Sequence, residues 1–362
     1  MKLATVFSGI GAIEQALKKL NIKYDIAFAC DTGERYIDVD VEKVKKTILN
    51  MSPHDKKRYI RSLYDATKKH NYVKDAYFAN YYIKEDNWYD DIRFIDGLEH
   101  QNQIDLFVGG SPCQSFSIIG KRAGLDDARG TLFYDYARLV DEMKPKVFIF
   151  ENVPGMLTHD RGNTWKVIKE VFDSLGYKIY ADVLNAKDYG IPQDRKRLFV
   201  VGFRDKNIKF NFPKPFELKT TMFDFLEKNI PAKHYLGQKG FEFVTNLKYK
   251  NRARINHEII QTQKANQQFN WNGDFVFEPL SKVEKNKEIV QRAYVGVWKG
   301  QRGVWRQLTY RECMRLMGFS DEFKIVVPNV PAYRQAGNSI VVNVLEEIVK
   351  EIMKVVNFYE KD

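Results

Sequence analysis

The chain has 362 residues, of which 44% are hydrophobic and 14% aromatic, and this composition excludes a disordered, fibrous or low-complexity protein. It has three scattered cysteines and no apolar run of about 18 residues, which predicts a protein of the reducing cytoplasm that is neither secreted nor membrane-bound and has no metal site. The formal net charge of +11 is concentrated in residues 201–310, which hold 20 Lys and Arg against 10 Asp and Glu.

The first part of the chain predicts alternating strands and helices. Residues 3–17 read as a buried strand, a glycine turn and an amphipathic helix, and a second strand covers 24–30. Further buried strands are expected at 104–108, 147–150 and 198–201, with helices at 133–143 and 165–175. This alternation predicts an α/β fold with a mostly parallel sheet covered on both faces.

Three segments depart from that alternation. Residues 38–75 contain two Lys-rich helical stretches and predict an inserted helical pair. After about residue 205 the alternation fails among prolines and polar residues, which predicts a smaller, irregular domain. Residues 340–356 form an amphipathic helix that is expected to return to the first domain. The basic irregular segment suggests a module that holds a polyanion, although a solvated lysine-rich surface explains the charge equally well.

The glycine turn at residues 7–11 and the acid that ends the second strand suggest a nucleoside site. Such a turn lets the backbone approach a ligand at a helix N-terminus, and Asp31 is placed to accept both ribose hydroxyls. The third glycine of the dinucleotide fingerprint is missing, which favours S-adenosyl-L-methionine over NAD. A purely structural turn is the alternative.

Cys113 follows a strand that ends in Gly109 and Gly110, where open α/β sheets place their ligands. Its loop is rich in Gly, Ser and Pro, whereas a structural cysteine would stand in an apolar run. This exposure suits a nucleophilic thiolate, with an inert loop cysteine as the alternative.

Two other strand ends carry charged groups. Glu151 follows four apolar residues, so we expect a raised pKa and a role in donating a proton to a ring nitrogen, unless it is only a stabilising acid near a helix N-cap. Arg195 and Arg197 are expected on one face of an extended segment. Two guanidinium groups there would fit a phosphate, or a carbonyl oxygen beside a carboxylate.

Together these motifs resemble the DNA cytosine-C5 methyltransferases, most closely those of bacterial restriction–modification systems. The resemblance is collinear through almost the whole chain, except for residues 38–75 and about 206–305. The motifs that carry it are FSGIG at 7–11, GSPCQSFS at 110–117, RGTLF at 129–133, ENV at 151–153, QDRKR at 193–197, LTYRECMRLMGF at 308–319 and GNS at 337–339.

The resemblance implies a role for each reactive residue. Cys113 would be the nucleophile that adds to C6 of cytosine, so that C5 can take the methyl group of S-adenosyl-L-methionine. Glu151 would protonate or hydrogen-bond N3 and the exocyclic amine. Arg195 would hold the O2 side and orient Glu151, and Arg197 of the same motif would also be catalytic.

The resemblance also implies a cofactor pocket in which Asp91 faces the adenine amine. Its residues would be Phe7, Ser8, Gly9, Ile10, Gly11, Asp31, Asp91, Ile92, Pro112, Leu132, Asn338 and Ser339.

A cytosine inside a duplex must be flipped into such a pocket. The loop at 117–129 has the glycines and charges to close over DNA, and we expect Ile119 to wedge the duplex. The target sequence would be read within 206–305, where phosphate contacts should outnumber base contacts. The predicted DNA-binding residues are Gln114, Ser117, Ile119, Lys121, Arg122, Arg129, Arg252 and Arg254, and further candidates are Arg292, Lys299, Arg302 and Arg306.

The expected architecture is a Rossmann-like, adenosylmethionine-dependent methyltransferase domain plus a smaller target-recognition domain. The catalytic domain would comprise 1–204 and 320–362, with 38–75 as a helical insertion, and the target-recognition domain 205–319. The expected partner is double-stranded DNA, bound by a monomer in the bacterial cytoplasm or nucleoid. A cognate restriction endonuclease that acts separately is compatible with this reading.

Three other functions are weighed against this one. A tRNA cytosine methyltransferase of the same superfamily would have a similar pocket, but the basic, aromatic-bearing segment of about 110 residues favours a module that reads duplex DNA. A non-catalytic DNA-binding regulator is disfavoured because the thiol, acid and guanidinium are all present. A nicotinamide dehydrogenase is disfavoured by the missing third glycine.

Overall fold

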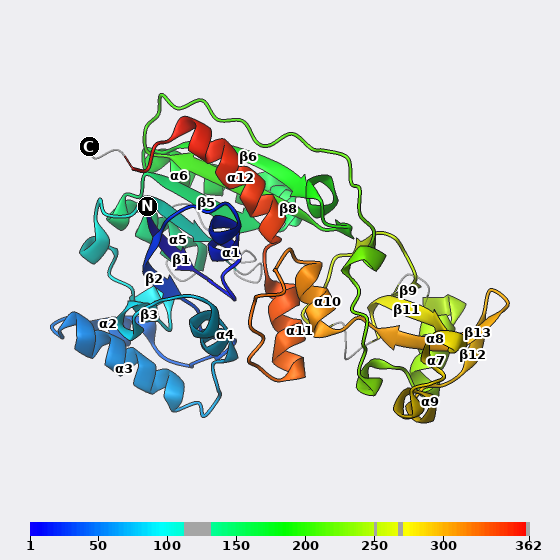
Figure 1. The fold of residues 1–362 in the computed structure, drawn as a ribbon. Coiled ribbons are helices and arrows are strands. Elements are labelled where there is room, and N and C mark those ends of the chain that lie inside the picture. Colours follow the sequence, from blue (N-terminus) through cyan, green and yellow to red (C-terminus); the bar gives the residue numbers. More distant parts are fainter. Residues whose placement is uncertain (112–131, 250–251, 267–270, 360–362) are drawn as a thin grey trace. The chain divides into compact units, whose positions relative to one another are not determined.

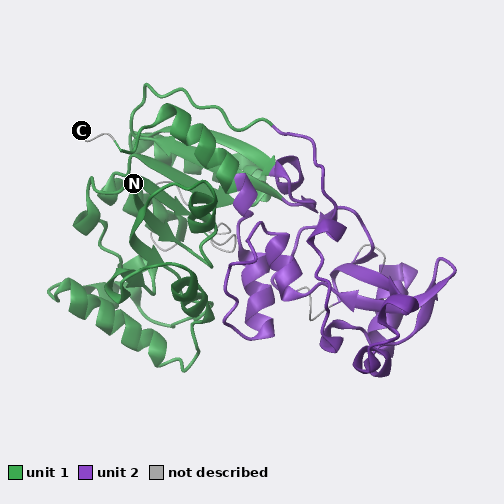
Figure 2. Cartoon of the chain, in the orientation of Figure 1, with its two compact units in different colours: residues 1–184, 196–214, 345–362 green, residues 185–195, 215–344 purple. Residues whose placement is uncertain are grey.

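The computed structural model describes residues 1–111, 132–249, 252–266 and 271–359 (Figure 1). The chain forms two compact units (Figure 2): unit 1 comprises 1–184, 196–214 and 345–362, and unit 2 comprises 185–195 and 215–344. In the described part of the chain, no helix has both the length and the apolar character needed to cross a membrane.

A seven-stranded sheet in the order β3-β2-β1-β4-β5-β8-β6 forms the centre of unit 1. Its strands are β1 (Lys2–Val6), β2 (Asp25–Cys30), β3 (Trp88–Tyr89), β4 (Leu106–Gly109), β5 (Val147–Asn152), β6 (Lys178–Asn185) and β8 (Lys196–Phe203). The pairs β1–β2, β1–β4, β2–β3 and β4–β5 are parallel, whereas β5 and β8 are antiparallel. The strand order reverses between β1 and β4, which is the Rossmann-like arrangement, and the predicted α/β class is confirmed.

Aromatic side chains fill the core of unit 1. Helices α5 (Leu132–Met143) and α6 (Asn163–Ser174) contribute rings that pack on those of β4 and β5. Phe107 of β4 stacks on Tyr136 of α5 with 4.7 Å between the ring centroids, and Phe148 of β5 lies 4.7 Å from Phe172 of α6. The strand ends that carry the predicted site residues are therefore held by a rigid core.

Residues 38–75, predicted to be a helical insertion, contain helices. These are α2 (Val41–Ile48) and α3 (Pro53–Asp65), and α4 (Tyr72–Asn80) follows directly. Asp40 and Ser52 cap α2 and α3, because each side chain accepts a backbone N–H three residues further on. Ile48, Ile60 and Tyr64 form part of a small apolar cluster of their own.

Unit 2 contains a four-stranded sheet in the order β12-β13-β11-β9 and a two-stranded pair β10-β7. The strands are β7 (Gln193–Asp194), β9 (Ala253–Ile255), β10 (Ile260–Gln261), β11 (Gly273–Pro279), β12 (Gly296–Trp298) and β13 (Gln301–Gln307), and the helices are α7 (Gln238–Thr245), α8 (Leu280–Val283), α9 (Lys287–Arg292), α10 (Tyr310–Arg315) and α11 (Asn329–Asn338). Trp305 is fully buried among Phe241 and Phe277. Unit 2 therefore contains more regular secondary structure than its sequence predicted. The strand pattern is weak in the sequence because these strands are short and rich in polar residues.

The boundaries of the two units differ from the predicted domain boundaries. Residues 320–344, expected in the catalytic domain, belong to unit 2, as do 185–195. Helix α11 packs against α10, which explains why the chain stays in unit 2 beyond residue 319. Most of α12 (Val342–Val355) belongs to unit 1, where Glu346 forms an ion pair with Lys19 of α1 (Ala12–Lys19).

Candidate active site

The turn after β1 has a left-handed backbone at its two glycines. The φ angles of Gly9 and Gly11 are +52° and +78°, and helix α1 begins immediately after Gly11. An added Cβ at Gly11 would lie 2.2 Å from the ring of Tyr81, whose hydroxyl donates to the carbonyls of Ile10 and Gly11. At Gly9 the nearest atom would be 4.0 Å away. The backbone at Gly9 is therefore open to close approach by a ligand at a helix N-terminus.

Phe7, Ser8 and Asp31 connect this turn to the rest of the sheet. Half-buried Phe7 packs against the core of unit 1. The Ser8 hydroxyl donates to the Cys30 carbonyl (3.1 Å) and accepts the Cys30 N–H (3.0 Å). One oxygen of the Asp31 carboxylate accepts the N–H of Gly9 (2.9 Å), and the other accepts the N–H of Gly33 (2.8 Å). Burial raises the pKa of Asp31, and these two backbone donors oppose the rise.

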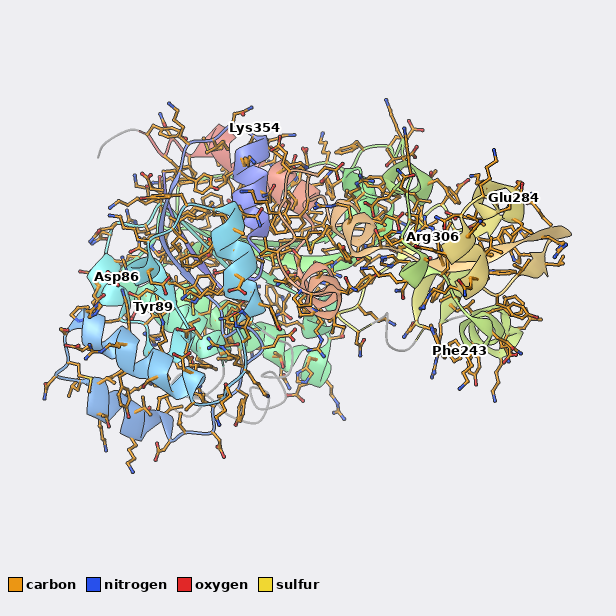
Figure 3. The ribbon with its side chains drawn as sticks, turned by 60° about the horizontal axis from the view of Figure 1, so that its bottom comes forward. Asp86, Tyr89, Phe243, Glu284, Arg306 and Lys354 are labelled. Atoms are coloured by element: carbon orange, nitrogen blue, oxygen red, sulfur yellow. The ribbon has the colours of Figure 1, made fainter. Side chains whose placement is uncertain are left out.

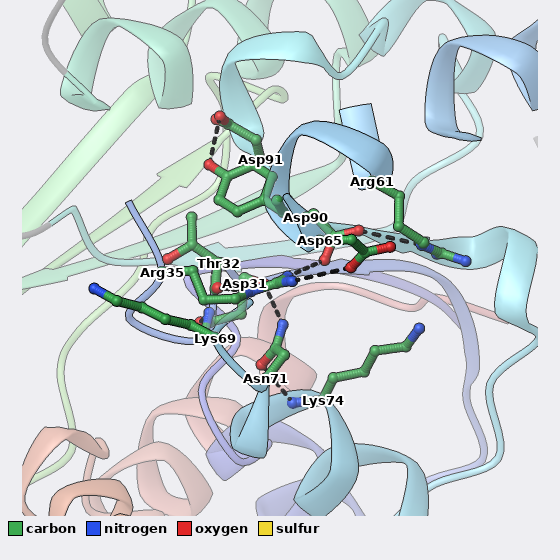
Figure 4. Close-up of polar contacts among 12 residues, drawn as sticks. Asp31, Thr32, Arg35, Arg61, Asp65, Lys69, Asn71, Lys74, Asp90 and Asp91 are labelled. Carbon is green, nitrogen blue, oxygen red and sulfur yellow. Dashed lines mark hydrogen bonds and ion pairs between the residues drawn. The ribbon is translucent and has the colours of Figure 1, made fainter. Parts of the chain in front are cut away.

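Asp91, labelled in Figure 4, follows β3. Two neighbouring residues hold its carboxylate. Its carboxylate is 2% exposed and accepts the Arg93 guanidinium (2.7 Å to Oδ2) and the Arg93 backbone N–H (3.0 Å to Oδ1). It also accepts the hydroxyl of Tyr64 from α3, 2.8 Å from Oδ2. Ile92 is buried in the core beside it. The position predicted to face an amine is therefore a carboxylate with a fixed orientation.

The ends of β4 and β5 lie in close contact. An added Cβ at Gly110 would be 2.5 Å from the carbonyl oxygen of Glu151, so only glycine fits there. The side-chain amide of Asn152 donates to the carbonyl of Ser111, 2.8 Å away. Ser111, two residues before Cys113 in the sequence, is therefore held against the end of β5.

Glu151 forms an ion pair with Arg197 of β8. Arg197 Nε lies 3.1 Å from Glu151 Oε1, and the two side chains are 19% and 15% exposed. Arg197 also donates to the carbonyl of Lys196 (2.7 Å). The guanidinium group therefore holds the direction of the carboxylate at the end of β5.

Arg195 is a buried residue of unit 2. Its guanidinium group donates to the carbonyls of Gln263 (2.9 Å), Gly337 (3.1 Å) and Ser339 (2.8 Å). Ser339 itself is buried, whereas Asn338 before it is exposed. The roles predicted for Asn338 and Ser339 in a cofactor pocket stay predictions.

The expectation that Arg195 and Arg197 lie on one face of an extended segment is wrong. The Arg195 N–H bonds to the carbonyl of Gln193 (3.0 Å), which makes a tight turn between β7 and β8. Beyond this turn the two guanidinium groups take different partners, because Arg195 bonds to carbonyls of unit 2 and Arg197 pairs with Glu151 in unit 1.

Part of the predicted site lies outside the described residues. These positions are Pro112, Cys113, Gln114, Ser117, Ile119, Lys121, Arg122 and Arg129. Leu132, which is half-buried, begins α5 directly after them. The other two cysteines, Cys30 and Cys313, are buried, and burial raises the pKa of the Cys30 thiol further above its ordinary value.

The predicted DNA-binding arginines of unit 2 have different surroundings. Arg252 is exposed before β9. Arg254 is partly buried, donates to the carbonyl of Ile259 (2.8 Å) and lies 3.6 Å from Asp274, whose pKa burial raises to about 6. Arg254 is thus engaged within the sheet, and its DNA contact stays a prediction.

Among the further candidates, Arg306, which is labelled in Figure 3, does not lie on the surface, and the prediction that it contacts DNA is wrong. It is fully buried and pairs with Glu278 and Glu312, each at 2.8 Å. Arg292, Lys299 and Arg302 are exposed, as expected of residues that reach a phosphate.

Sequence reasoning missed Tyr64 and Arg93, the two partners of Asp91. Arg93 could have been found, because it stands two positions after the acid and can reach back to it. Tyr64 gave no such signal, since its spacing from Ile60 on α3 is that of an ordinary apolar helix face.

Comparison with known proteins identifies the family. The family model described as C-5 cytosine-specific DNA methylase matches residues 1–354. Type II methyltransferase M.HhaI of Haemophilus parahaemolyticus is 40% identical over 262 residues, which cover 70% of this chain and 77% of that protein. Type II methyltransferase M.SsoII of Shigella sonnei is 34% identical over 290 residues, which cover 78% and 71%. The crystal structure of S. pombe Dnmt2 methyltransferase shares the fold, with a TM-score of 0.63 at 17% identity over 99% of this chain and 100% of that one. This chain therefore belongs to the C-5 cytosine-specific DNA methylase family and is a DNA cytosine-5 methyltransferase (EC 2.1.1.37) similar to bacterial type II enzymes.

Proposed function

We propose that this methyltransferase modifies a cytosine within a short specific site of duplex DNA through a covalent adduct with Cys113. The observation that carries this proposal is the arrangement at the ends of β4 and β5. There Glu151 is oriented by Arg197, and Ser111, two residues before Cys113, is hydrogen-bonded to Asn152. A nucleophile, an acid and a guanidinium are the groups that addition to a cytosine ring requires.

Cys113 is the thiol best suited to attack. Cys30 is 2% exposed and Cys313 is fully buried, so neither side chain is accessible to a base. Attack of the Cys113 thiolate on C6 forms the S–C6 bond and moves the electron pair of the C5–C6 double bond onto C5, which becomes the nucleophile for methylation. Loss of the C5 proton to solvent and expulsion of the thiolate then restore the double bond.

Glu151 would hold a proton at N3 of the cytosine. The negative charge that the thiolate brings into the ring when it adds to C6 develops on that side, and the proton at N3 stabilises it. We assign the orientation of this carboxylate to Arg197, with which it is paired. Arg195 would position the turn between β7 and β8 through its three carbonyl partners.

The described residues of unit 1 fit S-adenosyl-L-methionine. Gly9 leaves open backbone beside a helix N-terminus, Asp31 offers acceptors for ribose hydroxyls, and Asp91 offers an acceptor for an amine. This compound, when bound, supplies the methyl group. Phe7 and Ile92 would provide apolar surface for the purine.

The DNA would be held by the basic unit 2 and by the loop at 117–129, with Ile119 as a wedge for the flipped cytosine. Type II methyltransferases among the relatives support a role in restriction–modification, beside an endonuclease that acts separately. We propose a monomer that works in the bacterial cytoplasm or nucleoid.

The test is transfer of tritium from labelled S-adenosyl-L-methionine to mixed-sequence duplex DNA, with tRNA in parallel. We expect label in DNA that disappears in Cys113→Ala, and bisulfite sequencing would then locate the site. Label in tRNA alone would transfer the assignment to RNA cytosine. No label in either would leave a DNA-binding protein without this activity.

A further inference from the structure

Helix α3 contacts Asp91, which follows β3, through the side chain of Tyr64. Tyr64 is 1% exposed, and its hydroxyl donates to Oδ2 of Asp91, 27 positions away along the chain. The insertion lies outside the motifs that resemble the family. This contact therefore gives the insertion a direct connection to a residue of the proposed cofactor pocket.

The position of Tyr64 is determined by contacts other than this hydrogen bond. Its ring lies under the Arg35 guanidinium, 4.9 Å from ring centroid to the central carbon, and packs in the apolar cluster of α2 and α3. Arg35 in turn is paired with Asp90, which also lies 3.4 Å from Arg61 of α3. The hydroxyl of Tyr64 is thus presented to Asp91 by a framework that would persist if the hydroxyl were removed.

The chemistry of the pair makes Tyr64 a permanent donor. Burial, together with the adjacent Asp91 carboxylate, raises the pKa of the Tyr64 phenol well above its ordinary value, so it stays protonated in any ordinary buffer. Arg93 approaches Asp91 from its own turn, and its Nε lies 3.0 Å from both carboxylate oxygens. Arg93 thus contacts both oxygens of the carboxylate, and the Tyr64 hydroxyl adds a further donor on Oδ2 from a different part of the chain.

Asp91 also lines a small cavity of about 20 Å³, which has room for roughly one water molecule. Lys57 and Ile60 of α3 line the same cavity, together with Trp88 and Phe94. The wall of this part of unit 1 is therefore built jointly by the insertion and by the strand end that carries Asp91.

We propose that Tyr64 is a positioning residue for purine recognition: it fixes the Asp91 carboxylate as the acceptor that distinguishes the 6-amino group of S-adenosyl-L-methionine from a 6-oxo group. This inference rests on the proposed function. A fixed carboxylate accepts a hydrogen bond from an amine but repels a carbonyl oxygen in the same place. If the Asp91 carboxylate were held less firmly, discrimination between the 6-amino and the 6-oxo group of the ligand should weaken.

The experiment compares binding of S-adenosyl-L-homocysteine and S-inosyl-L-homocysteine to the full-length protein by calorimetry. We expect Tyr64→Phe to weaken binding of the adenosyl compound about five- to tenfold, because binding must then also restrict a carboxylate that has lost one of its donors, and to change binding of the inosyl compound less than twofold. In an Asp91→Asn background, Tyr64→Phe should have no further effect on the ratio. Tyr59→Phe, on the same helix, is the matched control and should change neither constant.

The outcomes separate this inference from the proposed function. If the unmodified protein binds neither compound, the proposed cofactor is wrong and the inference fails with it. The unmodified protein is expected to bind the adenosyl compound more tightly than the inosyl compound. If the Tyr64→Phe protein keeps that preference, binds the adenosyl compound more tightly, or loses affinity for both compounds equally, only the inference is overturned. Binding is measured without catalysis, so a defect in methyl transfer does not affect the result.

Discussion

Arg197 and Glu151 face each other across the antiparallel strands β8 and β5, with Nε 3.1 Å from Oε1. The register pairs Glu151 with Phe199, so the guanidinium reaches back along the strand to the carboxylate. Both side chains keep some exposure at the end of the sheet, as groups that must meet a substrate require. Glu151 is therefore oriented by Arg197, whereas the guanidinium group of Arg195 bonds to backbone carbonyls of unit 2.

Replacement of Arg197 by Lys should reduce methyl transfer about 10²-fold, the cost typical of one lost oriented donor in an active site. Lysine keeps the charge but not the planar group that sets the direction of Glu151. Single-turnover transfer to DNA measures the loss, and calorimetry with S-adenosyl-L-homocysteine should show unchanged binding. Exposed Lys196→Ala is the control. A rate within threefold of the unmodified protein would contradict this role.

Arg195→Ala should instead destabilise the fold. Its removal leaves the buried carbonyls of Gln263, Gly337 and Ser339 without a charged donor, and we expect a loss of roughly 3 kcal/mol in the free energy of unfolding. Urea denaturation followed by tryptophan fluorescence measures this loss. Arg195→Lys should recover part of it. Full stability combined with complete loss of activity would show that Arg195 acts on the substrate.

Stability should depend on pH through Glu14 of α1. Burial raises its pKa from 4.5 to about 7, and the carboxyl accepts hydrogen bonds from Tyr77 and Thr5. Because the pKa is higher in the folded state, the contribution of Glu14 to stability falls as the pH rises from about 4.5 to 7. Glu14→Gln removes this titration. The melting temperature of Glu14→Gln relative to the unmodified protein should therefore increase between pH 5 and 8, and a constant difference would refute the assignment.

Arg306→Ala should unfold unit 2 rather than alter its DNA site. The side chain is fully buried between Glu278 and Glu312, and removing one partner from such a network costs about 3–5 kcal/mol. Limited proteolysis with mass spectrometry should detect cleavage within 215–344 at temperatures where the unmodified protein resists. Resistance equal to that of the unmodified protein would exclude a structural role for Arg306.

Arg302→Ala should weaken DNA binding without changing stability. Arg302 is exposed on β13, opposite Val297 of β12, and a β-ribbon of this kind can present side chains to a phosphate. The logarithm of the binding constant should fall less steeply with the logarithm of salt concentration, by about one unit of slope. An unchanged slope would remove Arg302 from the DNA surface.

The sequence by itself determined the α/β class, the strands β1, β2, β4, β5 and β8, and the strand ends that carry Asp31 and Glu151. Hydrophobic period and glycine placement are local properties, so they locate a buried strand and its last residue without knowledge of distant contacts. The same local signals predicted the inserted helices and the final helix.

Only the tertiary structure decided which residues meet. It paired Glu151 with Arg197, brought Tyr64 to Asp91, buried Arg306 and kept residues 320–344 in unit 2. These features depend on contacts between positions far apart in the chain. The different surroundings of Arg195 and Arg197 depend in addition on the tight turn between β7 and β8, which one backbone hydrogen bond forms. Side chains of one type then differ in role according to what surrounds them, because burial and the available partners, rather than residue type, determine whether an arginine supports the fold or remains accessible to a ligand.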